Sequence, residues 1–209
     1  NALSNQEMVT GLKEALAQGV ETSINTLGRK DGFLKDHLVR ILMPDQLKTV
    51  EKLARKAGQG RYIDQFIMAM NRAAEQAVPE AAGILGNAIR KMGIEDAQAI
   101  LTGSDDAATR YFYRTSGRQL TSLLKPLVTR ATSQAGVTSA YKTLMNEVNS
   151  VGGGLLGGLL KTDSMDLDRY VTDKAMTGLF RYIAIEEKRI RKNPVARSTD
   201  LLKKVFGSS

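Results

Sequence analysis

The sequence predicts an all-α protein, and three observations carry this prediction. Apolar residues recur every three to four positions over most of the chain, which is the period of an α-helix with one buried face. The breaks between these runs fall at glycines and prolines, which commonly end or begin helices. No two alternating apolar runs are joined by a tight turn, so no β-hairpin is predicted. We expect a compact protein of about eight or nine helices of ordinary length.

The first helix is predicted to begin after Ser4, because Ser4 and Glu7 have the spacing of a capping box. Its apolar residues recur at helical spacing as far as Gly28, which predicts the helix end. The string GRKDGF, which starts at that glycine, predicts a turn. Residues 38–43 are too few and too close to Pro44 for a helix. We therefore expect at most one short extended segment in the chain, and we place it there.

The next predicted helices are shorter and are separated by single residues that break helices. Pro44 can begin a helix that Gly58 ends. A broad apolar stripe over residues 62–77 predicts a further helix. Pro79 ends that helix and fits the first turn of the one that follows. A short helix is expected over residues 95–101.

The second half of the chain predicts longer helices. From residue 104 the helical pattern runs to about residue 135, and Gly117 and Pro126 are expected to kink or divide this helix. The remaining expected helices cover residues 138–148, about 166–192 and 198–206.

The length of 209 residues fits one domain, so we expect a single helical domain over residues 3–207. Residues 150–162, rich in glycine and leucine, predict a mobile linker that divides this domain into two packed helical parts. The leucines of this segment either fold back on the core or form an exposed apolar tip. The sequence shows no internal repeat.

Charge and composition narrow the classes of function. The chain has 30 Lys and Arg against 22 Asp and Glu, a formal net charge of +8. This balance favours polyanionic partners such as nucleic acid or an anionic membrane surface. The chain has no cysteine, which excludes disulfides, thiolate metal sites and a cysteine nucleophile. No run of 18 apolar residues occurs, so no transmembrane span is expected.

Few residues point to catalysis. The chain has a single histidine, His37, which excludes a metal site built on several histidines and any Ser-His arrangement that does not use His37. Asp163, Asp166 and Asp168 form a carboxylate cluster. The cluster lacks the spacing of a calcium loop and precedes a predicted helix, whose N-terminus favours acids. We therefore assign no catalytic residue, no metal ligand and no cofactor, with an enzyme of unknown reaction as an alternative.

The string GSDDAATRYFYRTSGR, residues 103–118, raises the question of an active site, an anion-binding face or a plain helix start. Ser104 or Asp105 has the side chain of a helix N-cap. Asp105 and Asp106 lie where the exposed N–H groups of a first turn attract negative charge. We therefore interpret Ser104, Asp105 and Asp106 as a helix cap with a structural role.

The arginines of this string form a separate feature. Arg110, Arg114 and Arg118 are each four residues apart, so they share one face of the predicted helix. No Asp or Glu occurs between Asp106 and Glu147. We therefore expect that neighbours on the same helix do not neutralise the arginines, whose partners must come from another element or from a ligand.

Two interpretations of the three arginines follow. In the first, acids of adjacent helices such as Glu75, Glu80 or Glu95 pair with them, or water solvates them. In the second, they bind an anion, which can be a phospholipid head group, a lipid A phosphate or nucleic acid.

Several strings of the sequence occur together in one bacterial family. In chain order they are GRKDGFL, NRAAEQAVPEAA, AILTGSDDAATRYF, YVTDKAMTGLF, and EEKRIRKNP followed by LLKKVFG. With these strings the chain resembles, over nearly its whole length, the family catalogued as domain of unknown function 4197. The resemblance implies an exported, helical, envelope-associated protein, and it supplies no activity and no catalytic residue. It also implies an upstream signal peptide or lipoprotein leader, with which a start at Asn1 in place of Met agrees.

Two main hypotheses of function therefore stand. The first is a non-enzymatic exported protein of the bacterial envelope, periplasmic or anchored as a lipoprotein, whose helices enclose an apolar groove rimmed by arginine. This groove would bind a lipid or another anionic envelope component. The alternative is a basic nucleic-acid-binding helical protein, suggested by the net charge and the string EEKRIRKNPVAR. This alternative lacks a helix-turn-helix or another motif that reads nucleic acid.

Overall fold

The computed structural model of the chain describes residues 4–152 and 166–192. Within these ranges the regular elements are α-helices and short 3-10 turns, without a β-strand. The all-α prediction is therefore confirmed. The last expected helix, over residues 198–206, lies outside the described residues, as does most of the expected linker, from residue 153 onward.

The chain divides into two compact units, each assembled from stretches that are distant in sequence. Unit 1 consists of Asn1–Leu27, Pro79–Leu123 and Met176–Ser209, and unit 2 consists of Gly28–Val78 and Leu124–Ala175. Two long helices, α6 and α8, contribute residues to both units.

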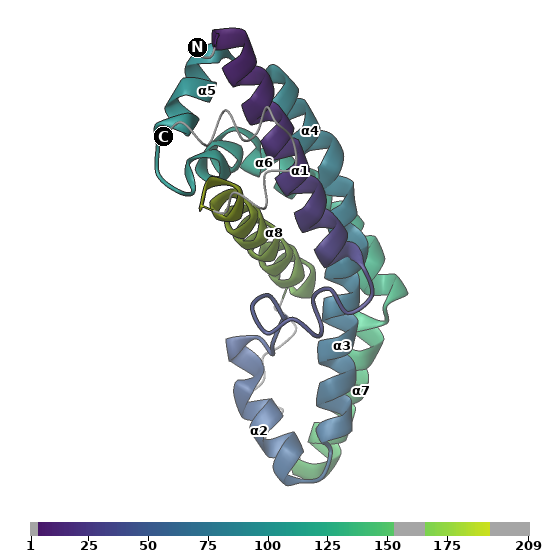
Figure 1. Cartoon of the computed structure of the whole chain (residues 1–209). Helices are drawn as coiled ribbons and strands as arrows, with labels where there is room; N and C mark the ends of the chain where they lie inside the picture. The colour runs from purple at the N-terminus through teal and green to yellow at the C-terminus, as the bar shows by residue number, and fades with distance from the viewer. Residues whose placement is uncertain (1–3, 153–165, 193–209) are drawn as a thin grey trace. The chain divides into compact units, whose positions relative to one another are not determined.

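Unit 1 is built from α1, α4 and α5 together with the first part of α6 and the second part of α8 (Figure 1). In chain order these helices are Asn5–Gly28, Ala82–Lys91, Ile94–Leu101, Ala107–Gln134 and Leu167–Lys192. The predicted capping box opens α1, because the Ser4 hydroxyl accepts a hydrogen bond from the Glu7 backbone N–H at 3.1 Å. The Glu7 carboxylate in turn accepts one from the Ser4 backbone N–H at 3.0 Å. This start of α1 is therefore confirmed.

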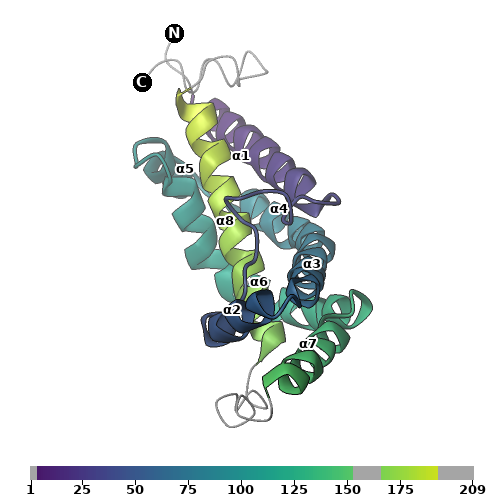
Figure 2. The same ribbon diagram turned by 90° about the horizontal axis from the view of Figure 1, so that it is seen from below.

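A glycine lets α1 approach α8 closely in unit 1, where the two helices run side by side (Figure 2). A Cβ atom at Gly19 would lie 3.5 Å from the Glu186 Cβ and 3.7 Å from the Ile190 side chain. Such a contact leaves room for one methyl group and no more, so a larger residue at this position would separate the two helices.

Unit 2 is built around α3 and α7, which pack against each other (Figure 1). The Phe66 and Tyr141 rings meet between them with centroids 5.8 Å apart. The short α2 packs on both helices and is followed by Gly58, whose φ of 75° favours glycine after a helix end. The bounds of these elements are Asp45–Leu47 for the 3-10 turn η1, Lys48–Lys56 for α2, Gly60–Ala77 for α3, Val78–Ala81 for the 3-10 turn η2 and Val137–Gly152 for α7.

The expected division of the long helix at Gly117 and Pro126 does not occur, because α6 runs without interruption through both residues. Pro126 leaves the carbonyl of Ser122 without its helical donor. Ser122 and Pro126 are both exposed, so water can satisfy the Ser122 carbonyl.

The segment 38–43, expected to be extended, forms no strand. The buried side chain of Asn71 on α3 forms the hydrogen bonds to this segment that a neighbouring strand would form in a sheet. Its amide oxygen accepts a hydrogen bond from the Ile41 N–H at 2.8 Å, and its amide nitrogen donates to the Ile41 carbonyl at 2.9 Å. The same nitrogen also donates to the carbonyl of Ile67 at 2.7 Å. One side chain therefore fixes this segment to α3.

Substitution of Asn71 tests this role. We expect Asn71→Asp to lower the free energy of unfolding by about 2–4 kcal/mol, because a carboxylate cannot donate to the two buried carbonyl oxygens. Urea denaturation at neutral pH measures the loss, and amide exchange at Ile41 should rise with it. Asn146→Asp, on the exposed side of α7, is the matched control. Equal stability of the two variants would contradict the assignment.

Candidate functional site

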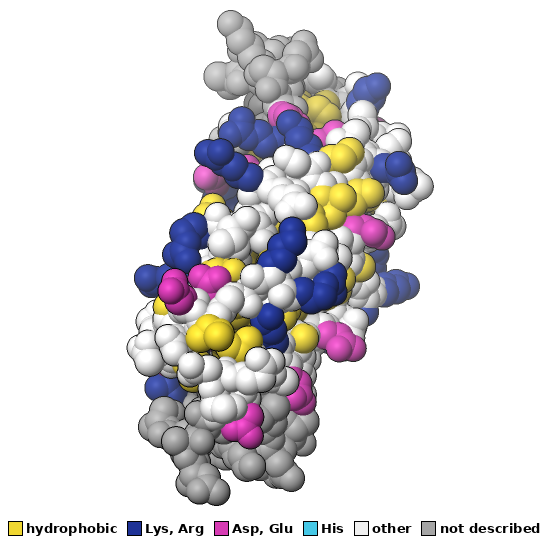
Figure 3. Space-filling model, turned by 90° about the horizontal axis from the view of Figure 1, so that it is seen from above, with side chains coloured by type: hydrophobic (Ala, Val, Ile, Leu, Met, Phe, Trp, Pro, Cys, Tyr) yellow, Lys and Arg dark blue, Asp and Glu magenta, His cyan; other side chains and the backbone are white. Residues whose placement is uncertain are grey.

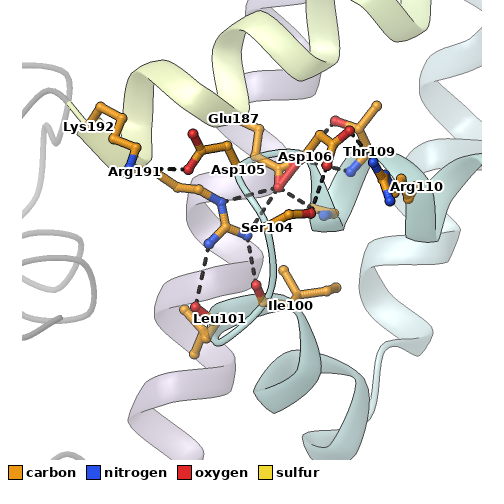
Figure 4. Close-up of polar contacts among 11 residues, drawn as sticks. Ile100, Leu101, Ser104, Asp105, Asp106, Thr109, Arg110, Glu187, Arg191 and Lys192 are labelled. Carbon is orange, nitrogen blue, oxygen red and sulfur yellow. Dashed lines mark hydrogen bonds and ion pairs between the residues drawn. The ribbon is translucent and has the colours of Figure 1, made fainter.

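The N-terminus of α6, which lies within residues 103–118, is capped by a glutamate of α8. One Glu187 oxygen accepts a hydrogen bond from the Ala108 N–H at 2.8 Å. The other accepts from the N–H and the hydroxyl of Thr109 at 2.9 and 2.8 Å (Figure 4). Glu187 is buried. First-turn N–H groups that could attract an external anion are thus occupied by a carboxylate of the protein itself.

Arg191, one turn further along α8, holds this glutamate in place. Its guanidinium lies 3.1 Å from the Glu187 carboxylate. The same group donates to the carbonyl of Ile100 at 2.8 Å, and to that of Leu101 at 3.5 Å, at the C-terminal end of α5 (Figure 4). A cation at a helix C-terminus and an anion at a helix N-terminus both complement the helix dipole. One Glu-Arg pair therefore joins the ends of α5 and α6 to α8.

The three predicted cap residues bond to side chains. The Ser104 hydroxyl donates to Asp106 at 2.7 Å, and Asp106 forms an ion pair with Arg110 at 3.0 Å. Asp105 forms an exposed ion pair with Lys192 of α8 at 3.3 Å (Figure 4). The hydrogen bond from Ser104, followed by that from Arg110, lowers the pKa of Asp106.

Sequence reasoning missed Glu187, because this capping residue lies 78 positions after Thr109. Local capping rules consider only the residues beside a helix start, so no short pattern could identify it. The string EEKRIRKNP, in which Glu187 and Arg191 stand, indicates by itself only a positively charged end of a helix.

Unit 2 contains a similar arrangement. A buried glutamate of α3, Glu75, accepts hydrogen bonds from the N–H groups of Phe33 and Leu34 at 3.2 and 3.3 Å. The guanidinium of Arg72, one turn earlier on α3, lies 2.9 Å from this carboxylate. It also pairs with Asp31 at 2.8 Å, and its hydrogen bond is the main cause that lowers the pKa of Asp31.

The turns held by the two glutamates share hydrogen bonds at matching positions, although Asp31 has a positive φ, of 68°, and Asp106 does not. In each, an aspartate accepts a hydrogen bond at its carbonyl from a basic residue four positions on, at 3.1 and 3.0 Å, and pairs with that side chain at 3.2 and 3.0 Å. The glutamate then accepts the N–H groups two and three positions after the aspartate. The sequence showed no repeat, since only a glycine, the aspartate and a basic residue are shared. The matching positions are Gly28 and Gly103, Asp31 and Asp106, and Lys35 and Arg110.

The three arginines lie on the exposed side of α6. Arg110 pairs with Asp106, so the expectation that no neighbour along the chain neutralises the arginines is wrong for this first one. The expectation considered only acids after Asp106. Asp106 itself directly precedes the helix and lies one turn from Arg110, close enough to pair with it. The guanidinium carbon of Arg114 lies 5.8 Å from the centre of the Tyr111 ring. Burial, with the charge of Asp96 second, raises the pKa of Tyr111.

Among the described residues, Arg114 and Arg118 form no ion pair. Of the acids expected to pair with the arginines, Glu75 is buried and forms its ion pair with Arg72. No ion pair within the described ranges joins Glu80 or Glu95 to the arginines.

The exposed face of α6 between residues 110 and 122 carries no acid. Besides the arginines it presents only neutral side chains that can form hydrogen bonds. Arginine, serine, threonine, glutamine and tyrosine are the residues that commonly contact phosphate oxygens in protein–nucleic acid complexes. We name this surface the arginine face, and its members are Arg110, Tyr113, Arg114, Thr115, Arg118, Gln119, Thr121 and Ser122.

The arginine face does not coincide with the hollow that the structure describes in unit 1. An apolar depression in unit 1 lies between α1 and α8, and the arginine face does not line it. Figure 3 shows basic side chains in several separate groups on the surface drawn there, with apolar atoms between them. The depression is lined by Leu12, Ala15, Leu16, Glu187, Ile190 and Arg191.

His37 is exposed, and within the described ranges no group of three His, Asp or Glu could hold a metal ion. None of the described helices is long and apolar enough to span a membrane.

Comparison with known proteins adds one finding. Residues 2–207 match the model of a protein family described as a protein of unknown function, DUF4197. No curated protein and no solved structure matches the chain.

The capping role of Glu187 is open to a direct test. We expect Glu187→Gln to cost about 3–5 kcal/mol of unfolding free energy, because the Arg191 side chain, only 10% exposed, then loses its anion. Amide exchange at Ala108 and Thr109 should rise in step. The control is Glu186→Gln, which removes a pair with the exposed Arg189 and should cost no more than about 1 kcal/mol. Similar losses for both variants would show that the buried pair does not hold the end of α6.

Proposed function

The chain belongs to the DUF4197 family of proteins of unknown function, and on this premise we propose that it is a non-enzymatic binding protein of the bacterial envelope. In this proposal the protein is exported, and its arginine face contacts the phosphate groups of anionic lipids. The observation that carries the proposal is the absence of acids from this exposed face, together with Arg114 and Arg118, which have no acidic partner among the described residues.

The chemistry of the arginine face suits phosphate. A guanidinium can donate two parallel hydrogen bonds to one phosphate group, which an ammonium group cannot do in the same geometry. Successive arginines stand about 6 Å apart along the axis of α6. They can therefore contact neighbouring phosphate groups of a surface, and the hydroxyl and amide groups of the same face can add hydrogen bonds.

The buried acids support a role without catalysis. Glu187 and Glu75 each accept two backbone N–H groups and pair with an arginine. A carboxylate held in this way is committed to the fold, since moving it would leave two backbone donors without an acceptor and would remove an anionic partner from a half-buried arginine. The structure thus gives a reason for both buried glutamates that requires no reaction.

The nucleic-acid hypothesis uses the same chemistry. The net charge of +8 would attract DNA as well as an anionic membrane, and the arginine face could contact a DNA backbone. The binding experiment below therefore includes both partners.

Neutralising the arginine face tests the proposal. One variant combines the three substitutions Arg110→Gln, Arg114→Gln and Arg118→Gln. We expect its binding to phosphatidylglycerol vesicles to weaken on the order of 100-fold, since each arginine near an anionic surface contributes about 1 kcal/mol. The melting temperature should stay near that of the wild type, because exposed ion pairs contribute little to stability. Vesicle co-sedimentation and DNA titration, each at about 50 and 200 mM salt, measure the affinities.

The matched control removes the same charge elsewhere. Lys52→Gln, Lys56→Gln, Lys142→Gln changes three exposed lysines of unit 2 and should weaken vesicle binding far less. An equal loss of affinity in both triple variants would show that the net charge of the protein, and not the arginine face, determines vesicle binding. A loss confined to DNA would favour the nucleic-acid alternative, and a collapse of the melting temperature would make the arginines structural.

The proposed compartment is tested separately. We expect the full gene product, expressed in its own bacterium, to fractionate with the periplasm or the membrane. Cell fractionation with a cytosolic marker measures this. Recovery of the intact protein in the cytosol alone would contradict the envelope role and leave the phosphate chemistry of the arginine face to be explained by another partner.

A further inference from the structure

Tyr113 is an exposed aromatic residue on the arginine face. Its 65% exposure is the largest among the large hydrophobic residues of the described chain. It follows Arg110 by three positions and directly precedes Arg114. These spacings place it about 60° around the helix from Arg110, so it flanks the arginines.

The Tyr113 ring is held in position, although most of it is exposed. Its edge-to-face contact with Phe180 of α8 has a centroid distance of 5.3 Å and an interplanar angle of 80°. A Cβ atom at Gly117, one turn later on α6, would lie 3.9 Å from the same ring. Phe180 itself is buried, so the tyrosine rests on the core of unit 1. A ring fixed in this way loses little further freedom when a partner covers it.

The hydroxyl group of Tyr113 has no hydrogen-bond partner among the described residues. The side chain therefore presents both an apolar ring and a free polar end to the surroundings. Tyrosine with this exposure is typical of places where one end of the ring meets an apolar layer and the other meets water.

We infer that Tyr113 is the apolar anchor of the arginine face and that the partner of this face is the interface of an anionic phospholipid bilayer. The inference rests on the proposed function and narrows its partner. A bilayer interface places phosphate groups beside an apolar layer, and tyrosine is enriched at that depth. The arginines meet the phosphates, while the ring enters the boundary below them. Duplex DNA and free phosphate supply phosphate oxygens without an apolar layer beside them.

The absence of tryptophan from the chain allows a specific experiment. Tyr113→Trp introduces a single tryptophan at the proposed anchor. With phosphatidylglycerol vesicles we expect its emission to shift to shorter wavelength and to be quenched by lipids brominated on the acyl chain. Phosphatidylcholine vesicles and duplex DNA should produce neither effect. Met68→Trp, at an exposed position of α3, is the control and should keep the emission of a water-exposed tryptophan.

Two further variants separate the ring from its hydroxyl group. Tyr113→Ala should weaken vesicle binding about tenfold, whereas Tyr113→Phe, which keeps the ring, should bind nearly as well as the wild type. The melting temperature identifies any variant that fails to fold, and high exposure of the residue predicts little change.

The outcomes distinguish this inference from the proposed function. Suppose that the triple arginine variant loses vesicle binding, while the emission of Tyr113→Trp stays unshifted and Tyr113→Ala binds normally. The anchor is then wrong and the proposed function stands. If the wild-type protein does not bind anionic vesicles, the proposed function fails and the anchor fails with it. A shift that also occurs with DNA would overturn the assignment to a bilayer.

Discussion

A buried glutamate, paired with an arginine and bonded to two successive backbone N–H groups, is the interaction on which each unit depends. Glu187 and Glu75 reach turns that lie 79 and 42 positions away in sequence. A buried carboxylate is costly unless its oxygens are satisfied, so the helix that carries it and the turn that it holds must take one relative position. Both units thus solve the same problem in a similar way: the N–H groups of a turn that follows a helix receive an acceptor from a distant glutamate.

This interaction also decides which part of the string at 103–118 is available to a partner. The N-terminus of α6 would otherwise attract an anion, but Glu187 already lies there. Asp105 and Asp106 are consequently free to pair with Lys192 and Arg110 at the surface. Among the described residues, arginines without an ion pair therefore begin at Arg114, two turns into the helix, on its side and not at its end.

Periodicity and caps predicted the helices because both are local. The capping box at Ser4 and the all-α class required only neighbouring residues. The segment 38–43 could not be predicted in detail, because Asn71 fixes it from 30 positions away. The candidate site divides in the same way: helical spacing placed the arginines on one face, whereas Glu187 and the contact between Tyr113 and Phe180 arise from tertiary packing.

The arginine face carries a small energetic cost that a partner can remove. Like charges four residues apart on a helix repel by about 0.2–0.5 kcal/mol for each pair, and Asp106 offsets only the charge of Arg110. An acid in place of Thr115 or Ser122, both exposed, would give Arg118 a neighbour three or four positions away on the helix. The described surface has none, so the repulsion persists in the free protein. Phosphate groups brought to this face relieve the repulsion and form charge-assisted hydrogen bonds, which favours the bound state over the free one.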